Sequence, residues 1–144
     1  MMKNNYKDSI KTMIDTNRLH KKIFEDAISK KGLHRTQHFI LMRLLDEEKL
    51  PSQKELAIHL NITPAAITMA LDKLEADGFI TRKSANDTRY NEITITDAGI
   101  EIVKESKHSF EKIDEAMFDG IRPDEKEIFD KCIKKMKNNL EKLI

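Results

Sequence analysis

A nearly uncharged helical face is predicted within the segment 61–83, "NITPAAITMALDKLEADGFITRK". Helical periodicity leaves five side chains on its outer side: Ala65, Ala66, Thr68, Met69 and Lys73. Small methyl-bearing side chains allow close approach to base edges and suit thymine methyl groups, and the Thr68 hydroxyl can hydrogen-bond to a base edge or a phosphate. Lys73 suits a backbone phosphate, which adds affinity without sequence information. These residue types predict contact with a nucleic acid.

A second group of charged residues follows in a polar stretch. Asp87 lies two residues before Arg89, so a charge-assisted hydrogen bond can hold the arginine extended. An arginine presented in this way suits a narrow minor groove. Arg82 and Lys83 precede the loop and are expected to meet phosphate, as are the backbone amides that follow the predicted N-cap, Thr63.

Two short helices joined by a tight turn are predicted to position the uncharged face. Ser52 and Glu55 fit a capping box at the start of the first helix. Asn61 tolerates the left-handed backbone that a tight turn requires. The second helix begins at Pro64, where the missing N–H is harmless, and Gly78 ends it.

The hydrophobic period then changes from that of a helix to that of strands. Residues 79–82 and 93–96 predict two short strands, joined by a polar loop at 84–89. Thr96 can cap the helix that follows. Two helices with a tight turn and a hairpin describe a winged helix-turn-helix, in which the second helix enters the major groove. The predicted fold class is mainly α with a small β-hairpin wing.

Long helices are predicted on both sides of this lobe, so we expect three regions. They are an N-terminal dimerisation helix at 1–32, a DNA-binding winged helix-turn-helix at 33–99 and C-terminal dimerisation helices at 100–144. Both terminal regions carry stripes of apolar residues: Ile10, Met13, Ile14, Leu19, Ile23, Phe24, Ala27 and Ile28 in the first, and Ile128, Phe129, Cys132, Ile133, Met136, Leu140, Leu143 and Ile144 in the last. Exposed apolar patches of that extent are unusual on monomers, so a homodimer is expected. The alternative is that these helices fold back on their own lobe.

The charge balance gives only weak electrostatic attraction to DNA. The net charge of the 144-residue chain is +1, and region 33–99 holds eight Lys or Arg against ten Asp or Glu. DNA contact would therefore depend on local placement of cations. The near-neutral charge also keeps open a winged-helix module that binds protein and does not read DNA.

Other function classes find little support in the sequence. There is no nucleophile elbow, phosphate-binding glycine loop or paired-carboxylate site, so an enzyme is not expected. No apolar run approaches the roughly 18 residues that span a bilayer, and the N-terminal residues lack a secretory signal. These features predict a cytoplasmic protein that does not bind membranes.

The histidines and the single cysteine raise a metal- or redox-responsive alternative. His34 and His38 lie one helical turn apart, and His108 could join them only through a tertiary contact. Ordinary surface or interface histidines are the favoured interpretation, with no metal and no cofactor. Cys132 lies in the apolar stripe of the last helix and is predicted to be a buried, inert thiol.

The chain resembles the MarR (multiple antibiotic resistance regulator) family. The matching residues are "PSQKELAIHLNITPAAITMALDKLEADGFITRK" and "DTRYNEITITDAG", preceded by "GLHRTQHFILMRLL". The resemblance implies a homodimeric regulator, most simply a repressor, with two winged lobes on a palindromic operator in double-stranded DNA. It implies that Arg89 enters the minor groove with Asp87 as its support. Thr88 departs from the pattern, since many members carry arginine there.

The same resemblance implies control by a ligand. A small, often aromatic or phenolic effector would bind between the helical dimer region and the winged lobes. It would favour a spacing of the two recognition helices that is unsuited to DNA. His34, Arg35 and His38 lie near the place where that crevice is expected.

Overall fold

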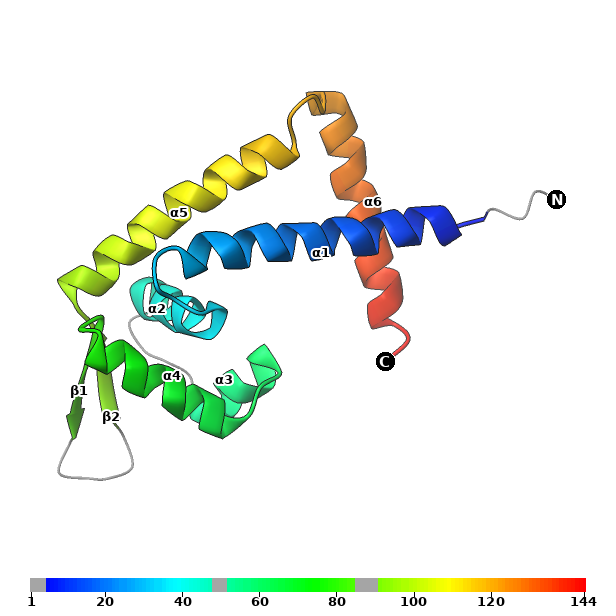
Figure 1. Ribbon diagram of the computed structural model, residues 1–144. Helices are drawn as coiled ribbons and strands as arrows, with labels where there is room; N and C mark the ends of the chain where they lie inside the picture. The colour runs from blue at the N-terminus through cyan, green and yellow to red at the C-terminus, as the bar shows by residue number, and fades with distance from the viewer. Residues whose placement is uncertain (1–4, 48–51, 85–90) are drawn as a thin grey trace. The chain divides into compact units, whose positions relative to one another are not determined.

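The computed structural model describes residues 5–47, 52–84 and 91–144 (Figure 1). Within these ranges the elements follow the order α1 (Lys7–Ser29), α2 (Arg35–Glu47), α3 (Gln53–Leu60), α4 (Pro64–Ala76), β1 (Ile80–Ser84), β2 (Asn91–Ile95), α5 (Asp97–Met117) and α6 (Pro123–Glu141). The predicted fold class, mainly α with a β-hairpin wing, is confirmed. The chain divides into two compact units, residues 1–111 and 112–144.

Local signals set the ends of the two short helices. The Ser52 hydroxyl accepts a hydrogen bond from the Glu55 N–H at 3.1 Å, which caps α3. Asn61 ends α3 with a left-handed backbone at φ 54°. The Thr63 hydroxyl accepts from the Ala66 N–H at 3.2 Å and caps α4. The turn between α3 and α4 is therefore short and fixed at both ends.

The core of the first unit is built from one face of each helix and of the hairpin. Its buried apolar residues are Ile28, Leu33, Ile40, Leu41, Leu44, Leu56, Ala57, Ile67, Ala70, Leu71, Leu74, Ile80 and Val103. The buried residues of α4 are the four that periodicity placed inward: Ile67, Ala70, Leu71 and Leu74. Because this face is held in the core, the opposite face of α4 must point outward.

The hairpin joins the end of α4 to the start of α5. Strands β1 and β2 pair in antiparallel fashion, from Ile80 opposite Ile95 to Ser84 opposite Asn91. The paired segments extend further toward the loop than the predicted 79–82 and 93–96. Backbone pairing, which depends on the partner strand, carries the sheet into residues that show no apolar alternation.

The terminal helices expose much of their apolar surface. The C-terminal end of α1 packs on the core through Phe24 and Ile28. Earlier in α1 the apolar side chains are exposed: Ile10, Met13, Ile14, Leu19 and Ile23. Helix α6, in the second unit, has no buried residue. Among the described helices, none has the length and apolar character needed to cross a membrane.

Two sequence predictions about individual burial are wrong for the single chain. Cys132 was expected to be buried but is exposed, because α6 has no buried face within its own unit. His38 was expected at a surface or interface but is 2% exposed. It lies on the inner face of α2, one turn before the buried Leu41.

Candidate nucleic-acid interface

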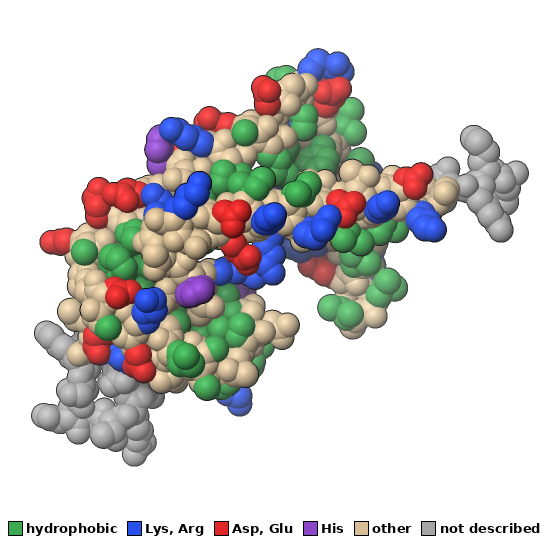
Figure 2. Space-filling view, in the orientation of Figure 1, with side chains coloured by type: hydrophobic (Ala, Val, Ile, Leu, Met, Phe, Trp, Pro, Cys, Tyr) green, Lys and Arg blue, Asp and Glu red, His purple; other side chains and the backbone are tan. Residues whose placement is uncertain are grey.

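The outer face of α4 is open to solvent, as predicted. Thr63, Ala65, Thr68, Met69 and Lys73 are exposed, and Ala66 is half-buried. The Met69 side chain is 73% exposed, so it is open to contact from outside the chain. On the side drawn in Figure 2, hydrophobic and uncharged atoms cover α3 and the neighbouring part of α4, whereas charges gather toward the hairpin.

The hydroxyls of this face already have internal partners. The Thr68 hydroxyl donates to the Pro64 carbonyl oxygen at 3.2 Å, one helical turn earlier. Its oxygen can still accept a hydrogen bond. The Thr63 hydroxyl accepts from the Ala66 N–H as the N-cap. The face therefore offers methyl groups and hydroxyl acceptors, which can meet thymine methyl groups and the amino groups of adenine or cytosine.

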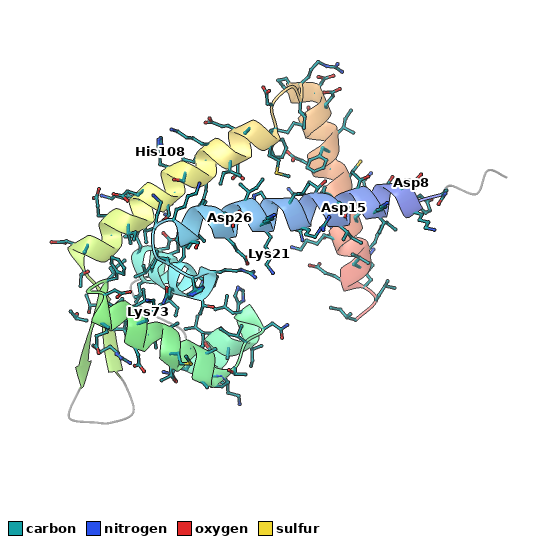
Figure 3. The ribbon with its side chains drawn as sticks, in the orientation of Figure 1. Asp8, Asp15, Lys21, Asp26, Lys73 and His108 are labelled. Atoms are coloured by element: carbon teal, nitrogen blue, oxygen red, sulfur yellow. The ribbon has the colours of Figure 1, made fainter. Side chains whose placement is uncertain are left out.

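Lys73 lies one turn further along the same helix (Figure 3). Its ammonium group is 3.7 Å from the Asp77 carboxylate, and its side chain is 53% exposed. Ion pairs between exposed residues four apart on a helix stabilise it only weakly, by about 0.3–0.5 kcal/mol. Lys73 can therefore exchange this partner for a phosphate at little cost.

Arg82 has a different setting from the phosphate contact that we expected. Its guanidinium donates to the Asp72 carboxylate at 2.6 Å and to both oxygens of Glu75, at 3.1 and 3.3 Å. The side chain is only 18% exposed. The hydrogen bonds to Glu75 and then to Asp72 raise the pKa of Arg82. Sequence reasoning passed over Asp72 and Glu75, although their spacing of three residues puts them on one side of α4.

The predicted contacts of the wing tip lie outside the described residues. Asp87 and Arg89 belong to the stretch between β1 and β2, and the side chain of Lys83 is likewise not described. The described strands carry the chain into and out of this stretch at Ser84 and Asn91. The roles of Asp87, Arg89 and Lys83 stay predictions.

His38 lies among aromatic rings from two other helices. Its ring centroid is 5.9 Å from that of Phe24 in α1 and 4.9 Å from that of Phe110 in α5, both in edge-on geometry. Its Nε2 is buried without a hydrogen-bond partner among the described residues. Burial, and then the positive charge of Lys107, lower the pKa of His38 to about 4. The imidazole is therefore neutral at pH 7.

The histidines do not form a metal centre within the described part of the chain. His34 is exposed while His38 is buried, and His108 is exposed on α5 (Figure 3). No group of three or more His, Cys, Asp or Glu residues there is placed to hold a metal ion. His34 and His38 thus face different environments despite their spacing of one turn.

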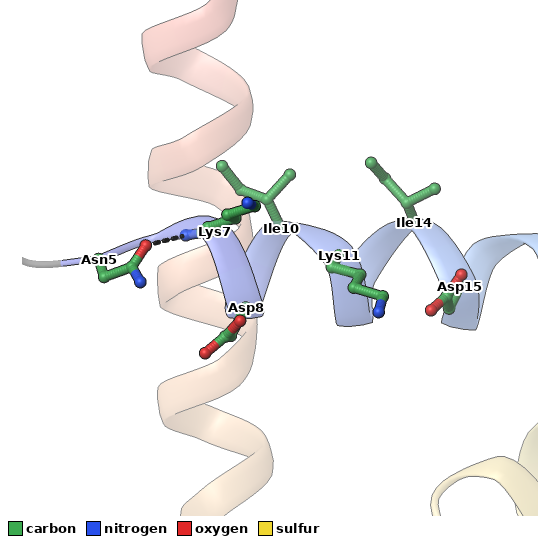
Figure 4. Close-up of a pocket in the computed structure, with 7 residues that line it drawn as sticks. All are labelled: Asn5, Lys7, Asp8, Ile10, Lys11, Ile14 and Asp15. Atoms are coloured by element: carbon green, nitrogen blue, oxygen red, sulfur yellow. Dashed lines mark hydrogen bonds between the residues drawn. The ribbon is translucent and has the colours of Figure 1, made fainter.

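A surface hollow near the start of α1 contains none of the predicted site residues (Figure 4). It is lined by Asn5, Lys7, Asp8, Ile10, Lys11, Ile14 and Asp15. The Asn5 side-chain oxygen accepts from the Lys7 N–H at 3.1 Å. Because all of these residues come from one helix and the residues just before it, the hollow is part of the exposed face of α1.

The geometry of the lobe defines a class of protein. A helix-turn-helix whose second helix exposes an uncharged face, followed directly by a two-stranded hairpin, is a winged helix-turn-helix. Residues 33–89 match the MarR family. That match agrees with the prediction that this chain is not an enzyme.

Two relatives come from Bacillus subtilis. The chain is 29% identical over 104 residues to the uncharacterised HTH-type transcriptional regulator YdgJ, covering 72% of this chain and 63% of YdgJ. It is 28% identical over 116 residues to the uncharacterised HTH-type regulator YwhA, covering 80% of this chain and 83% of YwhA. The chain thus spans less than two thirds of the length of YdgJ.

Solved structures share the fold over nearly the whole chain. MepR of Staphylococcus aureus, a regulator of the multidrug efflux pump MepA, has a TM-score of 0.75 at 21% identity and covers 93% of this chain and 98% of its own. A MarR family protein from Bacillus stearothermophilus has a TM-score of 0.78 at 18% identity and covers 98% of this chain and 99% of its own.

Proposed function

We propose that this chain is a sequence-specific DNA-binding transcriptional regulator, which acts in the cytoplasm as a homodimeric repressor and is released by a small ligand. The observation that carries the proposal is the exposed, nearly uncharged outer face of α4 in a winged helix-turn-helix of the MarR family. A structure of MepR from Staphylococcus aureus, with a TM-score of 0.68 at 21% identity, is a complex with DNA. That precedent supports DNA as the partner of this fold.

In the proposed complex α4 lies in the major groove. Ala65, Ala66, Thr68 and Met69 meet base edges, and the backbone amides after Thr63 receive a phosphate. Lys73 leaves Asp77 for a second phosphate. Arg89 enters the adjacent minor groove with Asp87 as its support. Base contacts would then come mainly from van der Waals contact and hydroxyl acceptors.

The proposed homodimer is supported by the exposed apolar faces of α1 and α6. A two-fold axis repeats α4 once per subunit, and two recognition helices about one DNA turn apart, roughly 34–36 Å, read a palindrome. The single uncharged face of α4 covers few base pairs. Two copies would give the selectivity that one copy lacks.

The proposed effector is a small aromatic or phenolic molecule. The support is the cluster of Phe24, His38 and Phe110, in which a neutral imidazole nitrogen is buried without a partner among the described residues. An aromatic ring with a hydroxyl group would suit this chemistry, since the hydroxyl can donate to that nitrogen. Its effect on DNA binding is limited by its difference in affinity between the two conformations.

The test combines selection of DNA with a matched pair of substitutions. The wild-type protein selects duplexes from a random pool, and binding to the enriched duplex is titrated across salt concentrations. Ala65→Glu and Ala98→Glu are then compared: both alanines are exposed second residues of a helix, in α4 and α5. We expect Ala65→Glu to weaken binding by more than about 100-fold, since a carboxylate among base edges and phosphates is both unpaired and repelled.

Ala98→Glu should change affinity by less than about twofold, because α5 is not part of the proposed DNA-contacting face. Equal affinities for the two variants would contradict DNA contact by α4. A pool without any enriched duplex would favour the alternative, a winged-helix module that binds another protein. Enrichment of a sequence with two-fold symmetry would support the DNA-binding and dimer proposals together.

A further inference from the structure

Arg82 joins the wing to the recognition helix. It stands in β1, opposite Ile93 of β2, and reaches two carboxylates near the C-terminal end of α4. The two hydrogen bonds to Glu75 form a fork-like pair, and a third at 2.6 Å goes to Asp72. Charge-assisted bonds of this geometry fix the orientation of the two partners as well as adding energy, because a planar guanidinium can donate to a carboxylate in only a few arrangements.

The hairpin is fastened on its other side as well. The Thr96 hydroxyl donates to the Gly78 carbonyl oxygen at 2.7 Å, and the Thr96 N–H donates to that of Phe79 at 3.0 Å. The Gly99 N–H donates to the Thr96 hydroxyl at 3.1 Å. These bonds join the two ends of the hairpin to each other and to the first turn of α5, whereas Arg82 joins β1 to α4. Two separate attachments leave the hairpin little freedom to rotate.

We propose that Arg82 is a positioning residue for DNA recognition, which holds the wing at a fixed angle to α4 through Asp72 and Glu75 instead of contacting phosphate itself. The effect of this contact on DNA binding rests on the proposed function, in which the wing and α4 enter neighbouring grooves of the same duplex. If the wing were held at the wrong angle, either the wing or α4 could enter its groove, but not both at once. Affinity for the correct sequence would then fall while general attraction to DNA remained.

The charges around Arg82 argue against the simpler role as a phosphate contact. One guanidinium lies between two carboxylates, so the three groups together carry a net charge of −1. A phosphate brought to this group would meet the unbalanced negative charge. Releasing the arginine would also break three hydrogen bonds and leave two exposed carboxylates without their cation.

Four variants separate positioning from phosphate contact. Arg82→Ala removes the guanidinium, and Arg82→Lys keeps the charge but loses the fork. A double variant, Asp72→Asn with Glu75→Gln, weakens the hold on Arg82 while removing two negative charges. Arg122→Ala is the control, because Arg122 also pairs with two carboxylates, Asp124 and Glu125, at the start of α6.

For a positioning residue we expect all three lobe variants to weaken binding to the selected duplex about tenfold, comparable to one charge-assisted hydrogen bond. Binding to a random duplex should change less than about twofold, or strengthen in the double variant. The salt dependence of binding should keep its slope in Arg82→Ala, since the number of phosphates neutralised by the protein stays the same. Arg122→Ala should behave like wild type.

The opposite pattern would overturn the proposal. If Arg82 binds a phosphate, Arg82→Lys should keep most of the affinity, because lysine carries the same charge. Arg82→Ala should then reduce the salt slope by about one, and the double variant should bind the selected duplex more tightly. These results would show that Arg82 leaves its carboxylates to reach DNA.

Amide hydrogen exchange tests the attachment without DNA. In Arg82→Ala and Arg82→Lys, amides of β1 and β2 should exchange at least about tenfold faster than in Arg122→Ala, while those of buried α4 residues should not change. Unchanged exchange in the hairpin would refute the positioning role. If the wild-type protein selects no duplex, the proposed function fails, and this measurement alone decides whether Arg82 fixes the wing.

Discussion

His38 is a titratable group enclosed by side chains that cannot solvate its charged form. It is packed edge-on against Phe24 and Phe110, with Nε2 unpartnered among the described residues and the cation of Lys107 nearby. A buried imidazole of this kind is tolerated while it is neutral. It lowers the free energy of unfolding at any pH where His38 is protonated in the unfolded chain but stays neutral in the folded one.

The predicted result is a loss of stability in mild acid. The pKa of His38 falls from 6.5 to about 4 on folding. Between these values the unfolded state binds more protons, so the free energy of unfolding declines as the pH falls from about 6.5 to about 4, by on the order of 3 kcal/mol. Above about pH 6.5, the free energy of unfolding keeps the full contribution of the neutral His38. Urea unfolding at several pH values measures it.

The matched variants are His38→Gln and His34→Gln. Glutamine does not titrate, so His38→Gln should lose that part of the pH dependence whatever its stability at pH 7. His34→Gln makes the same substitution at an exposed histidine one turn earlier and controls for the effect of the exchange itself. An unaltered pH profile in His38→Gln would mean that other groups cause the acid sensitivity.

Single side chains differ in how far the sequence predicts them. The outward position of Thr68 or Met69 follows from helical periodicity alone, and the structure agrees. His38 could have been found in the same way, since it precedes the apolar Leu41 by one turn. The partners of Arg82 could not, because its contact with Asp72 and Glu75 depends on how β1 lies against α4. The wing-tip predictions, Asp87 and Arg89, stay untested.

The junction of the hairpin with α5 depends on a glycine. A Cβ atom at Gly99 would lie 2.7 Å from Cγ1 of Ile95 and closer still to the carbonyl oxygen of Phe79. Both neighbours belong to the hairpin region, and the Phe79 oxygen accepts the Thr96 N–H. A side chain at position 99 must therefore push the hairpin away from α5 or strain the helix start.

We predict that Gly99→Ala destabilises the protein by about 1–3 kcal/mol, the usual cost of forcing an extra methyl group into a filled site. The sign of the change in the free energy of unfolding is informative, because alanine in a helix otherwise stabilises by up to about 1 kcal/mol relative to glycine. Chemical unfolding gives the change in free energy. A gain in stability would show that the hairpin relaxes easily at this junction and is not held there.

Element ends were predictable wherever a local signal sets them. The Ser52 and Thr63 hydroxyls each accept from the N–H three residues on, and Asn61 has the expected left-handed backbone. The strands were less predictable. Their extension toward Ser84 and Asn91 depends on pairing between segments that carry no apolar alternation. Hydrogen bonding to a neighbour, unlike capping, leaves no mark in the sequence of one strand.

At the scale of the whole molecule, both terminal helices, α1 and α6, expose apolar side chains. The exposed stripe of α6 comprises Ile128, Phe129, Ile133, Met136 and Leu140. Helix α1 also carries exposed apolar residues along its length. Phe118 and Phe129 contact each other edge-on within the second unit, which leaves most of the stripe uncovered. The sequence predicted this excess. Nothing within its own unit covers this stripe, so Cys132 is exposed there and not buried as the sequence predicted.

A substitution within this stripe should dissociate the proposed homodimer. Met136→Glu puts a charge among the apolar residues of α6, and a two-fold interface repeats that charge in both subunits. We expect the dimer dissociation constant to rise by at least about 100-fold, since an unpaired buried charge costs several kcal/mol.

Asn138→Glu is the control, because it makes the same change in net charge on the opposite side of α6. Sedimentation equilibrium should show a monomer for the first and a dimer for the second. If both variants sediment as wild type does, the stripe of α6 is covered by something other than a second copy, and the two recognition helices would need another means of staying together on DNA.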